Sequence, residues 1–294
     1  MRGLRMRIFN APKVRKFGGL ILPPFAQHTH TPVADKALYF CGMPKKTLVF
    51  LGSKPIGYRC FEHILQQQDA MNVEVCGLLC NEKPSMGAEL SLRELAEQNK
   101  VPVYEHPDHM PEADILYSVQ YHLILKSEHI ARARQIAVNL HMAPLPEYRG
   151  CNQFSLAIID GAREFGTSLH RIDERIDHGD LLWEKRFPIP DQCWVQDLYE
   201  LTYQASLDLF RETLPDILNE HYRPVPQEQL VAARGTSLHF RNEMNSLKQI
   251  DLSWDAEKIA RHIRGTSMPG FEPPFTIIDG KKIHFSTEWA GAKK

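Results

Sequence analysis

Residues 47–172 combine two patterns: short apolar runs typical of buried strands, and segments whose apolar residues recur at helical spacing. The run TLVFLGS, for example, is rich in β-branched and aromatic residues and ends at a glycine and a serine. Strands are predicted at 47–53, 73–80, 101–105, 113–120, 135–141 and 167–172, with helices at 57–68, 91–99, 127–134 and 151–161 between them. Strands that alternate with helices indicate an α/β fold, in which helices on both faces cover a mostly parallel sheet.

The ends of the predicted strands are where a ligand is expected, because parallel sheets bind ligands at the carboxyl ends of their strands. Two such ends are Gly52-Ser53 and Asn139-Leu140-His141. The sequence LGSKPIG lacks the GxGxxG spacing and no GK[ST] motif occurs, so neither a dinucleotide fingerprint nor a P-loop is present. Gly52 and Gly57 are interpreted as permitting a tight strand-to-helix turn, with a substrate phosphate at this helix N-terminus as the alternative.

The first 45 residues differ in charge from the rest, with nine basic residues and one acidic residue from Met1 to Lys46. Three interpretations compete: an organelle transit peptide, a basic arm for nucleic acid or anionic lipid, and an artefact upstream of a natural start at Met43. The last is favoured because MPKKTLVFLGS reads as an N-terminus that enters the first strand. We therefore expect residues 1–45 to be a basic extension, non-native or disordered, ahead of a main domain at 46–225 and a small C-terminal subdomain at 226–294.

Composition restricts the class of protein. Hydrophobic residues make up 43% and charged residues 24%, as in ordinary soluble globular chains, and no apolar run approaches the roughly 20 residues of a membrane span. Lys plus Arg number 35 against 36 Asp plus Glu, so the net charge of -1 gives no global field for holding nucleic acid. The six cysteines show neither a CxxC pair nor zinc-site spacing, which predicts reduced thiols in a cytoplasmic protein and no metal site.

Residues 139–182 hold the polar side chains that could carry chemistry. Asn139 and His141 lie two apart at the end of a predicted strand, so both side chains project to the same side of the sheet. The prolines and glycine of MAPLPEYRG then force an irregular loop, and a later polar loop holds Asp177. An amide that stabilises an oxyanion, an imidazole that moves a proton and a carboxylate that orients the imidazole can support acyl transfer. A purely structural hydrogen-bonding pair is the alternative interpretation of Asn-x-His.

This segment resembles the catalytic signature of the 10-formyltetrahydrofolate-dependent formyltransferases, which include enzymes acting on glycinamide ribonucleotide, methionyl-tRNA and amino sugars. The family signature is Asn-x-His, an LP-x-x-RG-type loop and a following Asp. Asn139, His141, LPEYRG (145–150) and Asp177, 36 residues after His141, fall into those places. The resemblance covers roughly 47–220 and implies a Rossmann-like formyltransferase core with a small C-terminal α+β subdomain. One departure, MAPLP in place of the common SLLP, concerns the amine substrate more than the three catalytic residues.

The resemblance also implies a mechanism and a cofactor site. A substrate amine would attack the formyl carbon on N10 of 10-formyltetrahydrofolate, with Asn139 and His141 stabilising the oxyanion and Asp177 holding His141 and helping to pass the amine proton to the folate nitrogen. VQYHLIL (119–125) resembles the folate-binding stretch of the family. The pterin would be bound mainly by backbone of His122, Leu123, Ile124 and Leu125 and by a loop that includes Ile172 and Asp173. By contrast, His178 and Asp180 are interpreted as solvated loop residues.

Among these enzymes, the C-terminal segment favours the amino-sugar group. Methionyl-tRNA formyltransferases carry a basic insertion after the second strand, whereas NEKPSMGAELS holds one lysine, Lys83, and two glutamates. Residues 222–294 have eleven basic and eight acidic residues, too small a surplus for a strong tRNA groove. Strands are predicted at 238–240, 275–279 and 281–286, with a helix at 253–267 and a hairpin turn at Asp279-Gly280. This order is similar to the tail of the amino-sugar enzymes, which commonly helps form a dimer or shapes the substrate cleft.

The expected activity is therefore N-formylation of a primary amine on a nucleotide-linked sugar, such as a dTDP- or UDP-4-amino-deoxyhexose, for surface polysaccharide (lipopolysaccharide) synthesis. We expect a cytoplasmic homodimer without metal and without membrane insertion. Methionyl-tRNA formylation, with tRNA as the partner, is the alternative. Two further alternatives are a non-catalytic sensor that binds folate or nucleotide, and hydrolysis of the formyl-folate by water.

Overall fold

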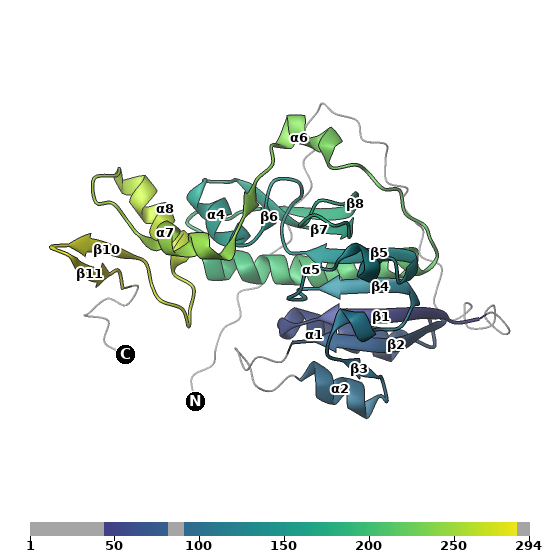
Figure 1. The fold of residues 1–294 in the computed structure, drawn as a ribbon. Helices are drawn as coiled ribbons and strands as arrows, with labels where there is room; N and C mark the ends of the chain where they lie inside the picture. The colour runs from purple at the N-terminus through teal and green to yellow at the C-terminus, as the bar shows by residue number, and fades with distance from the viewer. Residues whose placement is uncertain (1–43, 82–90, 287–294) are drawn as a thin grey trace, which may run out of the picture. The chain divides into compact units, whose positions relative to one another are not determined.

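The computed structural model describes residues 44–81 and 91–286, and within them seven strands form one sheet in the order β3-β2-β1-β4-β5-β7-β8 (Figure 1). The first five strands of that order run parallel, whereas β7 and β8 are antiparallel to their neighbours. The strands are β1 (Lys46–Gly52), β2 (Val73–Cys80), β3 (Val103–Tyr104), β4 (Ala113–Val119), β5 (Ala133–His141), β7 (Glu164–Arg171) and β8 (Leu181–Pro188). The prediction of a mostly parallel α/β sheet is confirmed.

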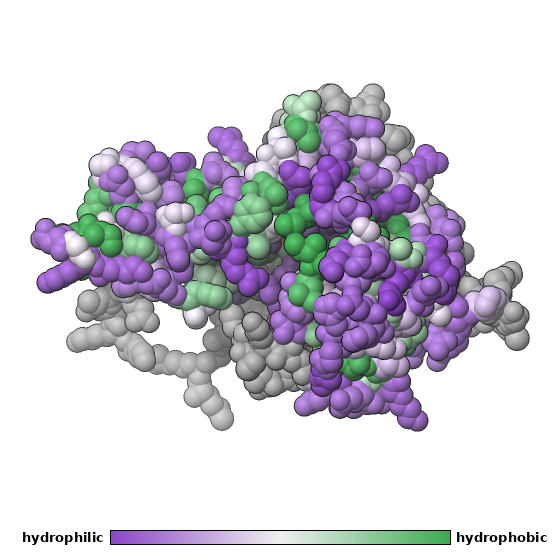
Figure 2. All heavy atoms as spheres, viewed as in Figure 1, coloured by the Kyte–Doolittle hydropathy of each residue, from purple (hydrophilic) through white to green (hydrophobic). Residues whose placement is uncertain are grey.

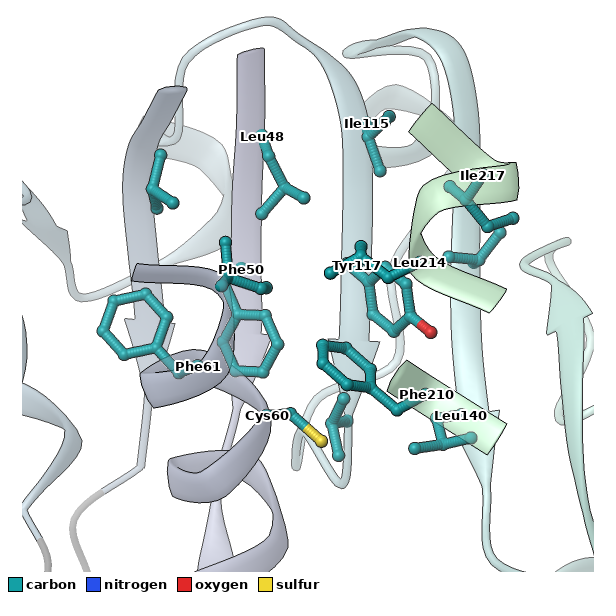
Figure 3. Packing of buried hydrophobic residues seen from close by; sticks show 14 of the residues in the cluster. Leu48, Phe50, Cys60, Phe61, Ile115, Tyr117, Leu140, Phe210, Leu214 and Ile217 are labelled. Carbon is teal, nitrogen blue, oxygen red and sulfur yellow. The ribbon is translucent and has the colours of Figure 1, made fainter. Parts of the chain in front are cut away.

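Side chains that alternate along each strand divide the core into two faces. On one face, Phe50 and Tyr117 pack against the long helices α1 (Lys54–Gln67) and α5 (Val195–Leu218), with α2 (Leu92–Gln98) beside them. Figure 3 shows Phe210 of α5 lying edge-on to Tyr117, with ring centroids 5.1 Å apart, while Phe61 of α1 stacks on Phe50 at 5.3 Å. Burial of large apolar side chains between the sheet and these helices is the main source of stability here.

The opposite face is covered differently. Val49 and Leu51 of β1 point into a second cluster with Leu116 and Leu125. The elements that flank this cluster are single turns, η2 (Pro107–His109) and α3 (Ser127–Ile130), together with loops. Helices therefore lie on both sides of the sheet as expected, but the long ones gather on one side.

Beyond β5 the chain builds an extension around α4 (Gln153–Ile159), which lies between the short strand β6 (Arg149–Gly150) and β7. Helix α8 (Ala256–Thr266), from the C-terminal part of the chain, packs against α4. Gly265 permits this approach, because a Cβ atom there would come within 2.9 Å of the Ser155 carbonyl oxygen. The other C-terminal elements are α6 (Glu228–Arg234), β9 (Leu238–His239), η3 (Arg241–Glu243), α7 (Met244–Lys248), β10 (Phe275–Ile278) and β11 (Lys281–His284).

Several predicted elements match the structure closely. The strand at 73–80, the start of α2 and the antiparallel hairpin of β10 and β11 around Asp279-Gly280 are confirmed. The Ser91 side chain accepts a hydrogen bond from the Glu94 backbone N–H, which begins α2. The helix predicted at 127–134 is wrong in length: it ends at Ile130, because residues from Ala133 onward join β5.

Some predictions fall outside the described residues, namely the interpretations of residues 1–43 and the loop that contains Lys83. The described cysteines are free thiols: Cys60, Cys76, Cys80, Cys151 and Cys193. None of the helices in 44–81 and 91–286 combines the length and the apolar character required to span a bilayer. Apolar surface does gather in places on the face drawn in Figure 2, both near the ends of β4 and β5 and on the hairpin of β10 and β11.

Candidate active site

Strand β5 and the loop after β7 bring the three predicted catalytic side chains together. Asn139 and His141 project from the carboxyl end of β5, and Asp177 lies in the loop between β7 and β8. The Asp177 Oδ2 atom is 3.5 Å from His141 Nδ1, and its Oδ1 atom is 3.4 Å from Asn139 Nδ2. These separations exceed an ordinary hydrogen bond, as is common at catalytic groups without substrate. The predicted convergence is therefore present; the chemical roles stay predictions.

His141 has a second contact that sequence reasoning missed. Its Nε2 atom lies 2.8 Å from the carbonyl oxygen of Tyr148, in the loop that joins β5 to β6. A carbonyl oxygen only accepts hydrogen bonds, so Nε2 must carry the hydrogen, which leaves Nδ1 as the nitrogen that faces Asp177. The backbone of the LPEYRG loop thus fixes both the orientation and the tautomer of His141.

A second histidine, His170, also belongs to the site and was not predicted. It lies on β7, directly across from Asn139 in the antiparallel pairing with β5. Its Nδ1 atom is 2.6 Å from the Arg171 carbonyl oxygen, and its Nε2 atom is 3.1 Å from Asn139 Nδ2 and 3.5 Å from Asp177 Oδ1. With the hydrogen on Nδ1, Nε2 accepts from the Asn139 amide and sets the direction of that side chain.

The Asp177 carboxyl is held in its charged form. Burial alone would raise its pKa, but the neighbouring His141 and His170 rings and the backbone N–H of Gly150 together hold the pKa of Asp177 well below its usual range. The Gly150 N–H donates to Asp177 Oδ2 at 2.9 Å. Gly150 adopts φ +84°, and a Cβ atom there would lie 2.2 Å from the His239 carbonyl oxygen, so glycine is required at this contact.

The loop from Met142 to Gly150 is fixed at both ends. Near its start, the Ser168 hydroxyl donates to the Ala143 carbonyl oxygen at 2.9 Å and accepts from the Leu145 N–H at 3.1 Å. At its end, β6 pairs in parallel with β9 of the C-terminal segment. The groups that touch His141 and Asp177 therefore sit in a loop that other elements hold in place.

The residues predicted to bind folate form a mixed set. Leu125 is buried in the second core cluster, and Ile172 packs against the same cluster. The Leu123 and Ile124 side chains are 38% and 64% exposed, so apolar surface is presented next to the end of β4. His122 is exposed, and its ring lies 4.8 Å from that of Tyr121. This arrangement offers an apolar surface of the kind that flat heterocyclic ligands contact.

The loop that follows Ile172 is more ordered than the sequence suggested. His178 was expected to be a solvated loop residue, but its side chain is only 14% exposed and lies between two carboxylates. Its Nδ1 atom is 2.9 Å from Asp173 Oδ2, and its Nε2 atom is 3.1 Å from Glu228 Oε1 of α6. The Asp180 carboxylate lies 4.0 Å from Arg171, and the Asp180 backbone carbonyl accepts a hydrogen bond from the Arg171 N–H at 2.9 Å. The Asp173 side chain is thus already engaged, and His178 links the loop to the C-terminal segment.

Two cationic side chains, Lys54 of α1 and Arg241 of η3, lie close enough for the charge of Arg241 to act on Lys54. Lys54, the first residue of α1, donates to Gln120 Oε1 at 2.8 Å. Its pKa is lowered, first by burial of the ammonium group and then by the positive charge of Arg241. Across residues 44–81 and 91–286, neither cation is paired with a carboxylate. Two adjacent positive charges without a counter-charge suit an anionic ligand.

In the part of the chain that the structure describes, no group of three or more His, Cys, Asp and Glu side chains is placed to hold a metal ion. The arrangement that does exist consists of an amide, two imidazoles and a charged carboxylate at strand ends. Such a set can donate hydrogen bonds to a developing oxyanion and exchange protons with an attacking group.

Comparisons with known proteins agree with this picture. A family model described as formyl transferase matches residues 48–214. A curated methionyl-tRNA formyltransferase from Dichelobacter nodosus is 30% identical over 179 residues, which are 60% of this chain and 54% of that protein. Another from Listeria monocytogenes is 30% identical over 158 residues, or 53% of this chain and 48% of the relative. The chain thus spans about half the length of the curated relatives it matches.

Solved structures resemble the chain over more of its length than the curated relatives do. An N-formyltransferase from Helicobacter canadensis, in complex with folinic acid and dTDP-3-aminofucose, superposes with a TM-score of 0.68 at 23% identity, covering 85% of this chain and 90% of that one. A 4-N formyltransferase from Francisella tularensis gives 0.65 at 17% identity, covering 83% and 97%. At these identities the likeness shows that the fold is shared, including elements that follow residue 214.

Proposed function

The chain belongs to the formyl transferase family, and from this premise we propose that it transfers a formyl group from 10-formyltetrahydrofolate to the primary amine of a nucleotide-linked amino sugar. The observation that carries the proposal is the convergence of Asn139, His141 and Asp177 at the end of β5. These are the residues of the family signature, and their spacing in the fold suits one reacting carbon. A surface-polysaccharide role, a homodimer and a cytoplasmic location stay predictions from the sequence.

The folate supplies an activated formyl group on a nitrogen that can leave. The exposed Leu123 and Ile124 side chains, with the loop after Ile172, would hold its ring system next to the carboxyl end of the sheet. The Asn139 amide, directed by His170, would donate to the formyl oxygen as negative charge develops there. Such a donor must already be in place before the reaction to be effective, and His170 provides this.

His141 and Asp177 would manage the proton. The incoming amine forms a bond to the formyl carbon and loses a proton, while the bond from that carbon to the folate nitrogen breaks and that nitrogen gains a proton. His141 Nδ1 faces the charged carboxylate of Asp177, so a proton taken up on Nδ1 is stabilised by the neighbouring charge. The Tyr148 carbonyl keeps the ring in this orientation throughout.

The choice of a nucleotide-linked amine is supported by the two cations beside the site. A sugar nucleotide carries a diphosphate, and Lys54 and Arg241 offer neighbouring positive charges that would bind it. The sugar N-formyltransferases of known structure share the fold over more than four-fifths of this chain. A second candidate, methionyl-tRNA formylation, is favoured by the curated relatives at 30% identity.

The direct test is mass spectrometry of amines incubated with the protein and 10-formyltetrahydrofolate. The panel contains dTDP-, UDP- and GDP-linked amino sugars and, in parallel, methionyl-tRNA, with His141→Ala as the inactive control. A formylated sugar nucleotide that is absent from the control supports the proposal. Formylation of the tRNA alone would keep the mechanism and replace the substrate, whereas formate release without any acceptor would indicate a hydrolase.

The cation pair makes a separate prediction. Loss of a charge-assisted hydrogen bond costs about 1.5–3 kcal/mol, so Lys54→Met and Arg241→Met should each raise KM for the sugar nucleotide by roughly 10- to 100-fold. Lys100→Met, an exposed lysine after α2, is the matched control. Unchanged KM values in both test variants would place the diphosphate elsewhere.

A further inference from the structure

We propose that Gln227, which lies outside the family match and just before α6, is a positioning residue that holds the Asp177 backbone in its catalytic conformation. This inference rests on the proposed function, in which Asp177 serves the proton transfer at His141. The Gln227 side chain donates its hydrogen bonds to backbone carbonyl oxygens, so it acts on the main chain that carries the Asp177 carboxylate.

The backbone at Asp177 needs outside support. Asp177 adopts φ +48°, in the left-handed region that residues other than glycine rarely occupy. Such a conformation persists only when surrounding contacts enforce it, and it is often found where function requires it. Two residues later, a Cβ atom at Gly179 would lie 2.2 Å from the Arg171 carbonyl oxygen, so the loop turns back tightly on the end of β7.

Gln227 supplies that support from a different part of the chain. Its side chain is 2% exposed, and its Nε2 atom donates to the carbonyl oxygens of both Asp177, at 3.1 Å, and Gly179, at 2.7 Å. Because both partners are acceptors, the amide nitrogen must be the atom that faces them. The two hydrogens of one amide group therefore span the Asp177–Gly179 turn.

The oxygen of the same amide group supports the view that Gln227 is present for its two donors. Gln227 Oε1 is buried without a hydrogen-bond partner among the described residues. A buried acceptor without a partner lowers stability, so an apolar side chain of similar size would be the better choice if this position only filled space. The two hydrogen bonds donated by Nε2 offset the cost of the buried, unpaired oxygen, which supports a role for these donors at the Asp177–Gly179 turn.

Contacts made by the residues on either side of Gln227 hold it next to the Asp177–Gly179 turn. Val225 and Leu181 exchange backbone hydrogen bonds of 2.9 and 2.8 Å, which fix the chain two residues before Gln227. Glu228, the next residue, lies 3.1 Å from His178 Nε2. The glutamine is thus held between two attachments, and its donors reach the carbonyl oxygens with little freedom to move.

The hydrogen bonds from Gln227 affect the position of the Asp177 carboxylate. Asp177 Oδ2 accepts from the Gly150 N–H while facing His141, a geometry that depends on the direction of the Asp177 backbone. A displacement of about 1 Å at a catalytic group can cost about 10²-fold in rate. Loss of the Gln227 donors should therefore lower kcat, while the KM of either substrate should change little because Gln227 contacts neither.

The test replaces Gln227 with methionine, which keeps the length of the side chain and removes both donors. We expect kcat per folded protein to fall roughly 10- to 100-fold, with both KM values within about threefold of wild type. Gln229→Met, an exposed position in the first turn of α6, is the matched control and should leave kcat unchanged. If Gln227→Met does not fold, Gln227→Asn keeps the amide but falls short of the two carbonyl oxygens, and a smaller loss of kcat with the same KM pattern is expected.

A double-mutant cycle separates positioning from a general structural role. If Gln227 acts through Asp177, adding Gln227→Met to Asp177→Asn should reduce kcat by less than about twofold further. Independent, multiplicative losses would overturn the positioning role, as would wild-type kcat in Gln227→Met alongside an inactive Asp177→Asn. Full activity in Asp177→Asn would instead overturn the proposed catalytic role of the carboxylate, a result that this cycle distinguishes from the other two.

Discussion

The two ring nitrogens of His141 have different surroundings, and a backbone carbonyl determines which of them faces Asp177. Nε2 contacts the Tyr148 carbonyl oxygen at 2.8 Å, whereas Nδ1 faces Asp177 across 3.5 Å. The carbonyl contact is short and fixed, so the ring cannot rotate to exchange its nitrogens without losing a hydrogen bond. In the proposed mechanism, proton exchange would take place at Nδ1, the nitrogen next to the Asp177 carboxylate.

The depressed pKa of Asp177 gives a pH prediction. Its carboxyl stays ionised from about pH 5 to 9, because its pKa lies below the ordinary value of about 3.9 for an aspartate. Asp177→Asn should accordingly lower kcat by about 10²–10⁴-fold, and by the same factor at about pH 6 and pH 8. The measurement is the ratio of wild-type to variant kcat across that range.

A change with pH in the ratio of wild-type kcat to Asp177→Asn kcat would be informative, and so would its direction. If burial prevailed and the pKa of Asp177 were raised, the wild-type carboxyl would become protonated toward pH 6 and behave like the amide of the variant. The ratio would then shrink as pH falls, which would contradict the electrostatic arrangement around Asp177. Asp180→Asn, a nearby carboxylate with only a long contact to Arg171, serves as the control and should show no pH-dependent effect.

Sequence reasoning reached some of these residues and not others for a physical reason. Asn139 and His141 could be paired because strand geometry alone puts residues two apart on one face. His170 could not, since its position opposite Asn139 depends on β7 running antiparallel beside β5. The Tyr148 carbonyl and Gly150 N–H carry no side-chain signal at all. Contacts made by backbone atoms, or set by sheet order, need the structure.

At the scale of elements, the longest helix, α5, is not among the helices predicted from the sequence. Helix α5 buries Thr202, Ser206 and Thr213 along with its apolar residues. Thr202 and Thr213 donate to backbone carbonyl oxygens four residues earlier, and Ser206 donates to the Thr167 hydroxyl of β7. Satisfied in this way, hydroxyl groups can be buried on a helix face, and they interrupt the apolar stripe by which a helix is recognised.

The packing of α5 predicts where that helix is sensitive to substitution. Phe210→Ala should lower the free energy of unfolding by about 3–5 kcal/mol, because it removes a fully buried ring that contacts Tyr117 and leaves a cavity. Leu201→Ala, on the same helix but 40% exposed, should stay within about 0.5 kcal/mol of wild type. Urea unfolding of both variants is the measurement. Equal losses would mean that α5 is held by its termini and not by this face.

At the scale of the molecule, residues 225–240 run past both catalytic loops, and we refer to them as the C-terminal strap. One end of the strap holds the Asp177 loop through Gln227, and the other pairs with the LPEYRG loop through β9. The Ser237 hydroxyl and N–H both donate to the Glu147 carbonyl oxygen. The two loops that complete the candidate site are thus both held by one segment that follows the core in sequence, so we expect the C-terminal part of the chain to affect catalysis through the geometry of these loops.

A substitution in the middle of the strap can test whether the sheet core and the C-terminal segment unfold as one cooperative unit. Arg234 binds Glu184 of β8 through two hydrogen bonds of 3.0 and 2.9 Å, and both side chains are about four-fifths buried. Arg234→Met leaves that carboxylate paired with Arg186 alone and should lower the free energy of unfolding by about 1.5–3 kcal/mol. Since the strap joins both loops to the tail, hydrogen exchange in β6 and in α8 should accelerate together.

Arg223→Met, an exposed arginine just before the strap, is the control and should leave both rates unchanged. Faster exchange in α8 alone would mean that the tail opens independently of the site, and the strap would then be a passive connection. Faster exchange in β6 without a change in α8 would confine the effect to the LPEYRG loop. Only a joint response fits a strap that couples the geometry of the catalytic loops to the folding of the C-terminal segment.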